Sequence, residues 1–214
     1  MTCLWTRILI ACYPGAHIRG GITYRTALLG AFVLALHAIG VQAQETGSWP
    51  RIVSWGVNAG FGAGDRSGVK YYSLLPHLDL SLPRIVDEPL ARYNLRAQWV
   101  LEPFVSYATN SVDTYEAGAN LLFFSLRYDR GQRVVPFIAG GEGALYTGLR
   151  DHGLGTHFQF SSQFGAGLEW FITRSTALSV TYRYRHISNA GLSSQNTGLN
   201  AHFGLLGLSY FPRR

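Results

Sequence analysis

The chain has 214 residues, with 18 Lys and Arg against 12 Asp and Glu, and a formal net charge of +6. No basic cluster is dense enough to indicate a nucleic-acid-binding surface. Charged residues make up only 14% of the chain, whereas Gly, Tyr and Phe number 25, 12 and 12. No long stretch shows the 3.6-residue apolar period of a helix, so we exclude a helical protein and look for strands.

The N-terminal region has the pattern of a secretory signal peptide. Arg25 precedes an apolar run over residues 27–41, and the small residue Ala43 ends the segment "VQA". The run is too short for a comfortable membrane-spanning helix, so we predict cleavage near Ala43. The expected organisation is a cleaved leader over residues 1–43, followed by one β-barrel domain over residues 44–214.

The leader contains both cysteines of the chain, Cys3 and Cys12. The mature chain of about 171 residues would therefore have neither a disulfide framework nor a thiol nucleophile. It would carry 15 basic and 12 acidic residues, because three arginines and no acids lie in the leader. This small excess gives no reason to expect a nucleic-acid partner.

After the leader, apolar and polar residues alternate with a period of two. Turn signals such as "GAGDRSG" (62–68) and "DRGQ" (129–132) separate the alternating segments. An even number of strands can close antiparallel without exposed edges, which hydrocarbon would not tolerate. The pattern predicts an all-β, eight-stranded antiparallel transmembrane barrel with strands near 51–62, 69–81, 93–108, 113–127, 132–147, 156–171, 175–188 and 200–211.

The alternation also predicts which side chains face lipid. Over residues 158–170 and 178–184, one face is mostly apolar or aromatic and the other is polar or glycine. A barrel of eight strands is just filled by its own side chains, so we expect a packed interior and not a pore. We expect five aromatic residues in the barrel wall or the interface belts: Tyr71, Tyr72, Trp99, Tyr115 and Trp170.

Three polar side chains continue the lipid-facing sets at one end of the barrel. His186 and Ser188 follow Tyr184 by steps of two, and Asn200 belongs to the outward set of the last strand. The β-carbons of His186 and Ser188 would lie about 7 Å apart, within reach of a hydrogen bond that activates the hydroxyl as a nucleophile. The cluster indicates either a hydrolase acting on lipid or polar residues solvated at headgroup height.

Other polar groups give weaker signals. Asp151, His152 and His157 lie in "DHGLGTH" and could be read as metal ligands, but they are better explained as an exposed loop, because no metal-binding motif accompanies them. By parity, Glu169 faces the interior and cannot serve the outward cluster. We therefore expect no metal and no cofactor.

Three stretches are similar to one known family. "HISNAGL" followed by Asn, Gly and Asn, "SLLPHLDLSL" (73–82), and the stretch 141–170 resemble the outer-membrane lipid A 3-O-deacylase (PagL) family. The resemblance implies an eight-stranded barrel that hydrolyses the ester-linked 3-position acyl chain of lipid A on its outer surface. It implies Ser188 as nucleophile, His186 as general base, and Asn189 with the Gly191 backbone N–H as the oxyanion hole.

One position departs from the family pattern, because Asn200 occupies the place of the expected glutamate. An asparagine can orient the imidazole but cannot add charge stabilisation to it. Two functions therefore stay open: an esterase that uses Asn200 as its third member, or a non-catalytic structural or adhesive barrel. The expected partners are lipid A within lipopolysaccharide and other outer-membrane lipids, the expected location is the outer membrane, and a homodimer is left open.

Overall fold

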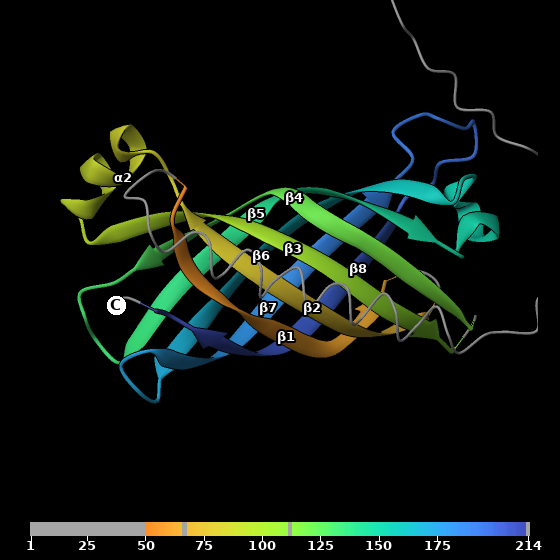
Figure 1. Ribbon diagram of the computed structural model, residues 1–214. Coiled ribbons are helices and arrows are strands. Elements are labelled where there is room, and N and C mark those ends of the chain that lie inside the picture. The colour runs from red at the N-terminus through yellow and green to blue at the C-terminus, as the bar shows by residue number, and fades with distance from the viewer. Residues whose placement is uncertain (1–49, 66–67, 111–112, 213–214) are drawn as a thin grey trace, which may run out of the picture. The chain divides into compact units, whose positions relative to one another are not determined.

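The computed structural model describes residues 50–65, 68–110 and 113–212. Within them, each strand pairs antiparallel with the next, and the last strand pairs with the first to close a barrel (Figure 1). The predicted fold is thus confirmed, and the leader with its cleavage site near Ala43 lies outside the described residues. The strands are β1 (Ile52–Gly64), β2 (Lys70–Ser81), β3 (Leu95–Thr109), β4 (Thr114–Tyr128), β5 (Val134–Thr147), β6 (Phe158–Phe171), β7 (Thr176–Ser188) and β8 (Leu199–Tyr210).

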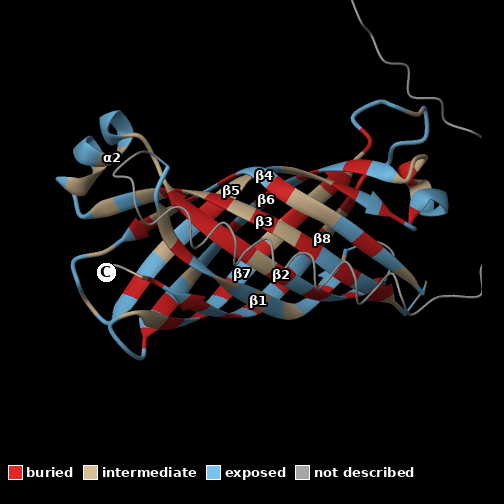
Figure 2. Cartoon of the chain, in the orientation of Figure 1, coloured by how far each residue is buried: buried red, intermediate tan, exposed pale blue. Residues whose placement is uncertain are grey.

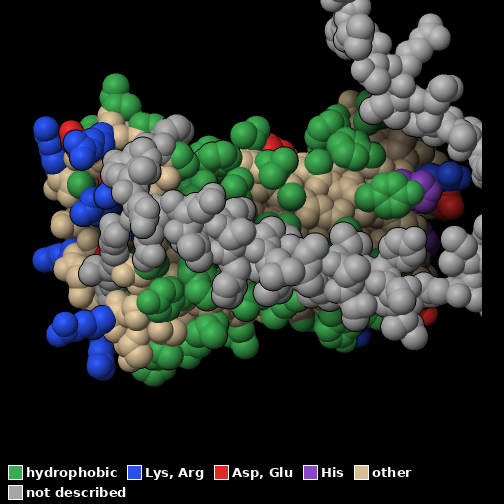
Figure 3. Space-filling view, viewed as in Figure 1, with side chains coloured by type: hydrophobic (Ala, Val, Ile, Leu, Met, Phe, Trp, Pro, Cys, Tyr) green, Lys and Arg blue, Asp and Glu red, His purple; other side chains and the backbone are tan. Residues whose placement is uncertain are grey.

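Residues mostly alternate between exposed and buried along the strands (Figure 2). On β7, Leu178, Val180 and Tyr182 are exposed, whereas the residues between them are buried. Hydrophobic side chains cover the visible wall of the barrel, while Lys and Arg gather at one end (Figure 3). An apolar exterior around a polar interior is the arrangement of an outer-membrane barrel.

The interior is packed, as the strand number predicts. Among the described residues, three buried ion pairs cross it: Arg127 with Glu169, Arg183 with Glu102, and Arg185 with Glu116. The first two pairs line a small cavity of about 50 Å³, too small for a pore. Glu169 faces inward, as parity predicts.

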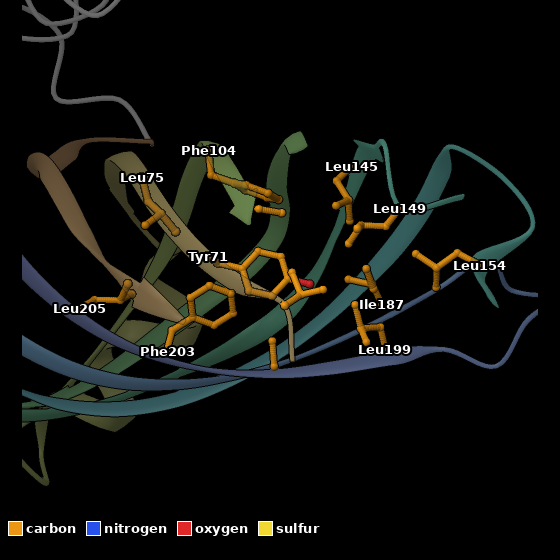
Figure 4. Close-up of a cluster of buried hydrophobic side chains, with 13 residues drawn as sticks. Tyr71, Leu75, Phe104, Leu145, Leu149, Leu154, Ile187, Leu199, Phe203 and Leu205 are labelled. Carbon is orange, nitrogen blue, oxygen red and sulfur yellow. The ribbon is translucent and has the colours of Figure 1, made fainter. Parts of the chain in front are cut away.

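An apolar cluster fills the interior on the side of the barrel where β7 ends (Figure 4). Tyr71 belongs to this cluster, so its predicted place in the outer wall or belt is wrong. It is fully buried, and its ring lies 5.5 Å from that of Phe203 and 4.8 Å from the Arg185 guanidinium. Its neighbour Tyr72 is 55% exposed on the outer wall, as a strand period of two requires.

Two short helical segments were not predicted. α2 (Arg84–Ala91) joins β2 to β3 and buries none of its residues; with eight residues and Pro89 inside it, it is too short for a helical period to be recognised in the sequence. The other, η1 (Arg150–Leu154), lies in the β5–β6 loop at the opposite end of the barrel. Neither of the helical segments among the described residues combines the length and apolarity needed to cross a bilayer.

Candidate active site on the outer surface

The three predicted site residues lie where β7 ends and β8 begins, and two of them, His186 and Asn200, are in direct contact. His186 and Asn200 are cross-strand partners, and the Asn200 side-chain oxygen lies 2.6 Å from Nδ1 of the imidazole. Ser188 lies two residues beyond His186 on the same outward face and pairs with Phe160 of β6. The parity argument is therefore confirmed for all three side chains.

The strand ends that carry these residues are anchored from inside. Ile187 separates His186 from Ser188, and Leu199 precedes Asn200. Ile187 and Leu199 are cross-strand partners, and both are buried in the apolar cluster (Figure 4). Because side chains alternate along a strand, the packing of Ile187 and Leu199 inside the barrel fixes the positions of the polar side chains outside it.

Gly198 leaves the space that the imidazole ring occupies. Its φ of +65° favours glycine, and a β-carbon there would stand 2.7 Å from Cε1 and 3.3 Å from Nε2 of His186. Nδ1 therefore faces Asn200, and the Cε1–Nε2 edge of the ring lies against Gly198.

The loop after Ser188 is built around Asn189, which is fully buried. Its side-chain nitrogen donates to the carbonyl oxygens of Leu154 and Gln195 at 2.8 and 2.9 Å. Its side-chain oxygen accepts the Gly191 N–H at 2.9 Å, and its own N–H donates to the Asn196 side chain at 3.0 Å. The two predicted oxyanion-hole residues thus contact each other directly.

The neighbouring β5–β6 loop supports this loop from one side. The N–H and hydroxyl of Thr197 both donate to the Gly153 carbonyl, at 3.0 and 3.2 Å. Gly153, with a φ of +90°, lies so close to Thr197 that a β-carbon would clash with the hydroxyl. The glycines of "DHGLGTH" therefore allow the two loops to touch beside the site.

The alternative metal site in that loop does not assemble. Asp151 pairs with Arg150, and His157 bonds the Thr147 carbonyl at 2.8 Å while stacking on Tyr146. In the part of the chain that the structure describes, no three His, Cys, Asp or Glu side chains gather as metal ligands.

Further polar side chains lie on the outer surface of the neighbouring strands, at the level of His186 and Asn200. Ser162 of β6 is the cross-strand partner of His186, and its hydroxyl donates to Glu142 of β5 at 2.8 Å. On the other side, the Asn200 amide donates to Asp65 at 2.7 Å. The sequence interpretation missed Asp65, which it treated as part of a turn, although it continues the odd-numbered outward set of β1.

Comparison with known proteins gives a consistent picture. The sequence pattern of the family described as "Lipid A 3-O-deacylase (PagL)" matches residues 38–209. Lipid A deacylase PagL of Pseudomonas aeruginosa is 37% identical over 75 residues, which cover 34% of this chain and 41% of that protein. The matched stretch therefore spans less than half of the curated relative.

A solved structure supports the fold. The crystal structure of the outer membrane enzyme PagL superimposes with a TM-score of 0.60 at 23% identity, over 71% of this chain and 97% of that one. Neisserial surface protein A gives a TM-score of 0.49 at 13% identity, over 74% and 95%. With the family pattern spanning most of the sequence, this chain is an outer-membrane β-barrel that belongs to the lipid A 3-O-deacylase (PagL) family.

Proposed function

We propose that this protein is a serine esterase that removes the ester-linked 3-position acyl chain of lipid A. The observation that carries the proposal is the 2.6 Å contact between Asn200 and Nδ1 of His186 on the lipid-facing wall, two residues from Ser188. A polar cluster facing hydrocarbon is costly, and a nucleophile with an oriented base gives it a purpose.

In the first half of the reaction, Ser188 attacks the acyl carbonyl carbon. Nε2 of His186 takes the hydroxyl proton, and the carbonyl π electrons move to the oxygen. When the tetrahedral intermediate collapses, the bond to the 3-position oxygen breaks. His186 returns its proton to that oxygen, which leaves as a hydroxyl, and the acyl chain stays on Ser188 as an ester.

In the second half, water takes the place of the sugar hydroxyl. His186 removes a proton from the water, the resulting oxygen attacks the acyl-enzyme, and Ser188 leaves with the proton from His186. A free fatty acid and the regenerated serine result. Because lipid A lies in the outer leaflet, this proposal requires the barrel end with Ser188 to face the cell exterior.

We assign the negative oxygen of the intermediate to the backbone N–H of Gly191; the donors of Asn189 have partners within the loops, so Asn189 serves by positioning this turn. The Gly191 N–H follows Ser188 closely and is positioned by its 2.9 Å bond to the Asn189 side chain. To serve the oxyanion, this N–H exchanges its amide partner for the ester oxygen. A donor of this kind typically contributes about 10²- to 10³-fold to turnover.

The alternative is a non-catalytic barrel that keeps the scaffold. It is favoured by one feature, the asparagine at position 200 where the family pattern expects a carboxylate. The two functions differ in whether lipid A loses an acyl chain.

The deciding experiment compares mass spectra of lipid A from cells that lack the protein, make it, or make the Ser188→Ala variant. We expect the loss of one hydroxyacyl mass only with the unaltered protein. Identical spectra in all three, with the barrel folded in the membrane, would establish the non-catalytic function.

A further inference from the structure

Asn200 has a second partner besides the imidazole. Its side-chain nitrogen donates to Oδ2 of Asp65 at 2.7 Å, and the Asp65 backbone N–H donates to the Asn200 carbonyl at 3.1 Å. The β1–β8 register ends at Gly64 and Ala201, so Asp65, the residue after β1, comes opposite Asn200 across the seam that closes the barrel. The carboxylate therefore has a defined backbone position beside the amide.

The chemistry of these three groups allows one arrangement of protons. An ionised carboxylate only accepts hydrogen bonds, so the Asn200 group that faces Asp65 must be the amide nitrogen. The amide oxygen then faces Nδ1 of His186, which must carry the proton of that bond. Nε2 is left without a proton, which is the form in which it can act as a base toward Ser188.

Without Asp65, nothing in this contact selects that arrangement. A rotated amide would present its nitrogen to Nδ1 and would move the ring proton to Nε2, where it blocks the base. The carboxylate also places a negative charge one amide beyond the ring that becomes positive in the transition state.

The other outward carboxylate near the site does not have this contact. Glu142 accepts the Ser162 hydroxyl and lies two strands away from His186 in the cross-strand row. Glu116 and Glu169 are inside the barrel with arginine partners. Among the described residues, Asp65 is the carboxylate that hydrogen-bonds to Asn200.

We propose that Asp65 is a positioning residue of this site: through Asn200 it holds His186 in the tautomer with a free Nε2, and it supplies the negative charge that position 200 lacks. The catalytic consequence rests on the proposed esterase function. The tautomer does not, because it follows from hydrogen bonds that exist without substrate.

The tautomer is tested by ¹⁵N spectra of the full chain, labelled at histidine and folded in detergent micelles. The His186 signal is identified by its loss in His186→Asn. We expect an Nδ1-protonated ring in the unaltered protein, and a mixture of both tautomers in Asp65→Ala. If the fraction of the Nδ1-protonated tautomer is the same in Asp65→Ala as in the unaltered protein, the proposal is overturned, whether or not the protein hydrolyses lipid.

The charge is tested by an isosteric exchange. Asp65→Asn should lower kcat by about 10- to 100-fold, the effect of losing one charge-assisted hydrogen bond, with KM changed less than about twofold. Asp65→Asn combined with Asn200→Asp keeps the shape and net charge but moves the carboxylate onto the ring, and should restore the rate. Failure of this exchange to restore the rate in a folded barrel would mean that Asp65 acts only in folding or binding.

Asp113→Asn is the matched control. Asp113 is an exposed carboxylate at the same end of the barrel, where it accepts hydrogen bonds from Tyr107 and Thr109 at 3.0 Å each, away from the site. It should leave both the spectrum and the rate unchanged. If the unaltered protein hydrolyses nothing, the proposed function fails, and the spectra alone decide the role of Asp65.

Discussion

The barrel holds polar side chains in two regions that follow different rules. Inside, arginines and carboxylates pair directly, as Arg183 does with Glu102, and each pair links strands that lie apart in the sequence. Outside, His186, Asn200 and Asp65 form a chain of hydrogen bonds along the rim, with one charged carboxylate at its end.

The difference reflects what each region must tolerate. A buried charge without a partner is costly, so interior groups are matched by opposite charges. At the rim, the groups do not cross-link the core, so their arrangement can serve proton transfer. We therefore expect substitutions in the interior to lower the free energy of unfolding without removing any catalytic group. We expect substitutions at the rim to lower the rate of ester hydrolysis while the barrel stays folded.

The largest effect on activity is expected for Ser188→Ala. It should reduce ester hydrolysis by more than about 10³-fold, because the acyl-enzyme can no longer form. The fold should persist, since Ser188 lies on the surface, and heat-modifiable migration on a gel would show this. Ser194→Ala, an exposed serine of the same loop, is the control and should keep full activity. Hydrolysis at the normal rate by Ser188→Ala would remove the esterase proposal.

The largest effect on stability is expected for Glu102→Ala. It leaves the Arg183 guanidinium buried without its carboxylate and also removes a 2.8 Å bond from Asn120. We expect a loss of about 3–5 kcal/mol in the free energy of unfolding, measured by urea titration in lipid vesicles. Glu142→Ala removes an exposed carboxylate and should cost less than about 1 kcal/mol. Equal losses for the two glutamates would contradict the division between interior and exterior.

Most of this division could be predicted from the sequence. A strand has a side-chain period of two, so the outward positions of His186, Ser188 and Asn200 followed from their neighbours alone. The period of two does not show what holds these residues in place. The structure shows that the inward pair Ile187 and Leu199 fixes their positions.

Two features escaped prediction for physical reasons. Asp65 and Asn200 are 135 residues apart, and only the register of the closing seam brings them together. Local pattern says nothing about that register. α2 was missed because it has only eight residues, with Pro89 among them, so its apolar spacing is too short to be recognised as a helical period.

Asn200→Ala sharpens the comparison at the rim. The imidazole loses its Nδ1 partner and its link to Asp65, so kcat should fall by about 10- to 100-fold. The free energy of unfolding should change by less than about 1 kcal/mol, because the removed side chain is only half-buried at a strand end. Gln195→Ala, an exposed amide in the adjoining loop, provides the kinetic control. A stability loss as large as that of Glu102→Ala would show that the rim residues serve the fold after all.

The smallest effect, and the finest test of geometry, is expected for Gly198→Ala. The added methyl group would stand 2.7 Å from Cε1 of His186, so the ring must leave its observed position, and turnover should fall by about tenfold. The φ of +65° adds strain of about 1 kcal/mol, which by itself affects stability and not chemistry.

Gly131→Ala separates the two causes. Gly131 has a φ of +82° with open space around it, in a turn at the far end of the barrel, so its variant carries similar strain without touching the imidazole. A matching loss of stability in both variants, with loss of turnover only in Gly198→Ala, would show that the glycine at position 198 is required for the place of the ring. Unchanged turnover in Gly198→Ala would mean that the ring need not stand where the structure has it.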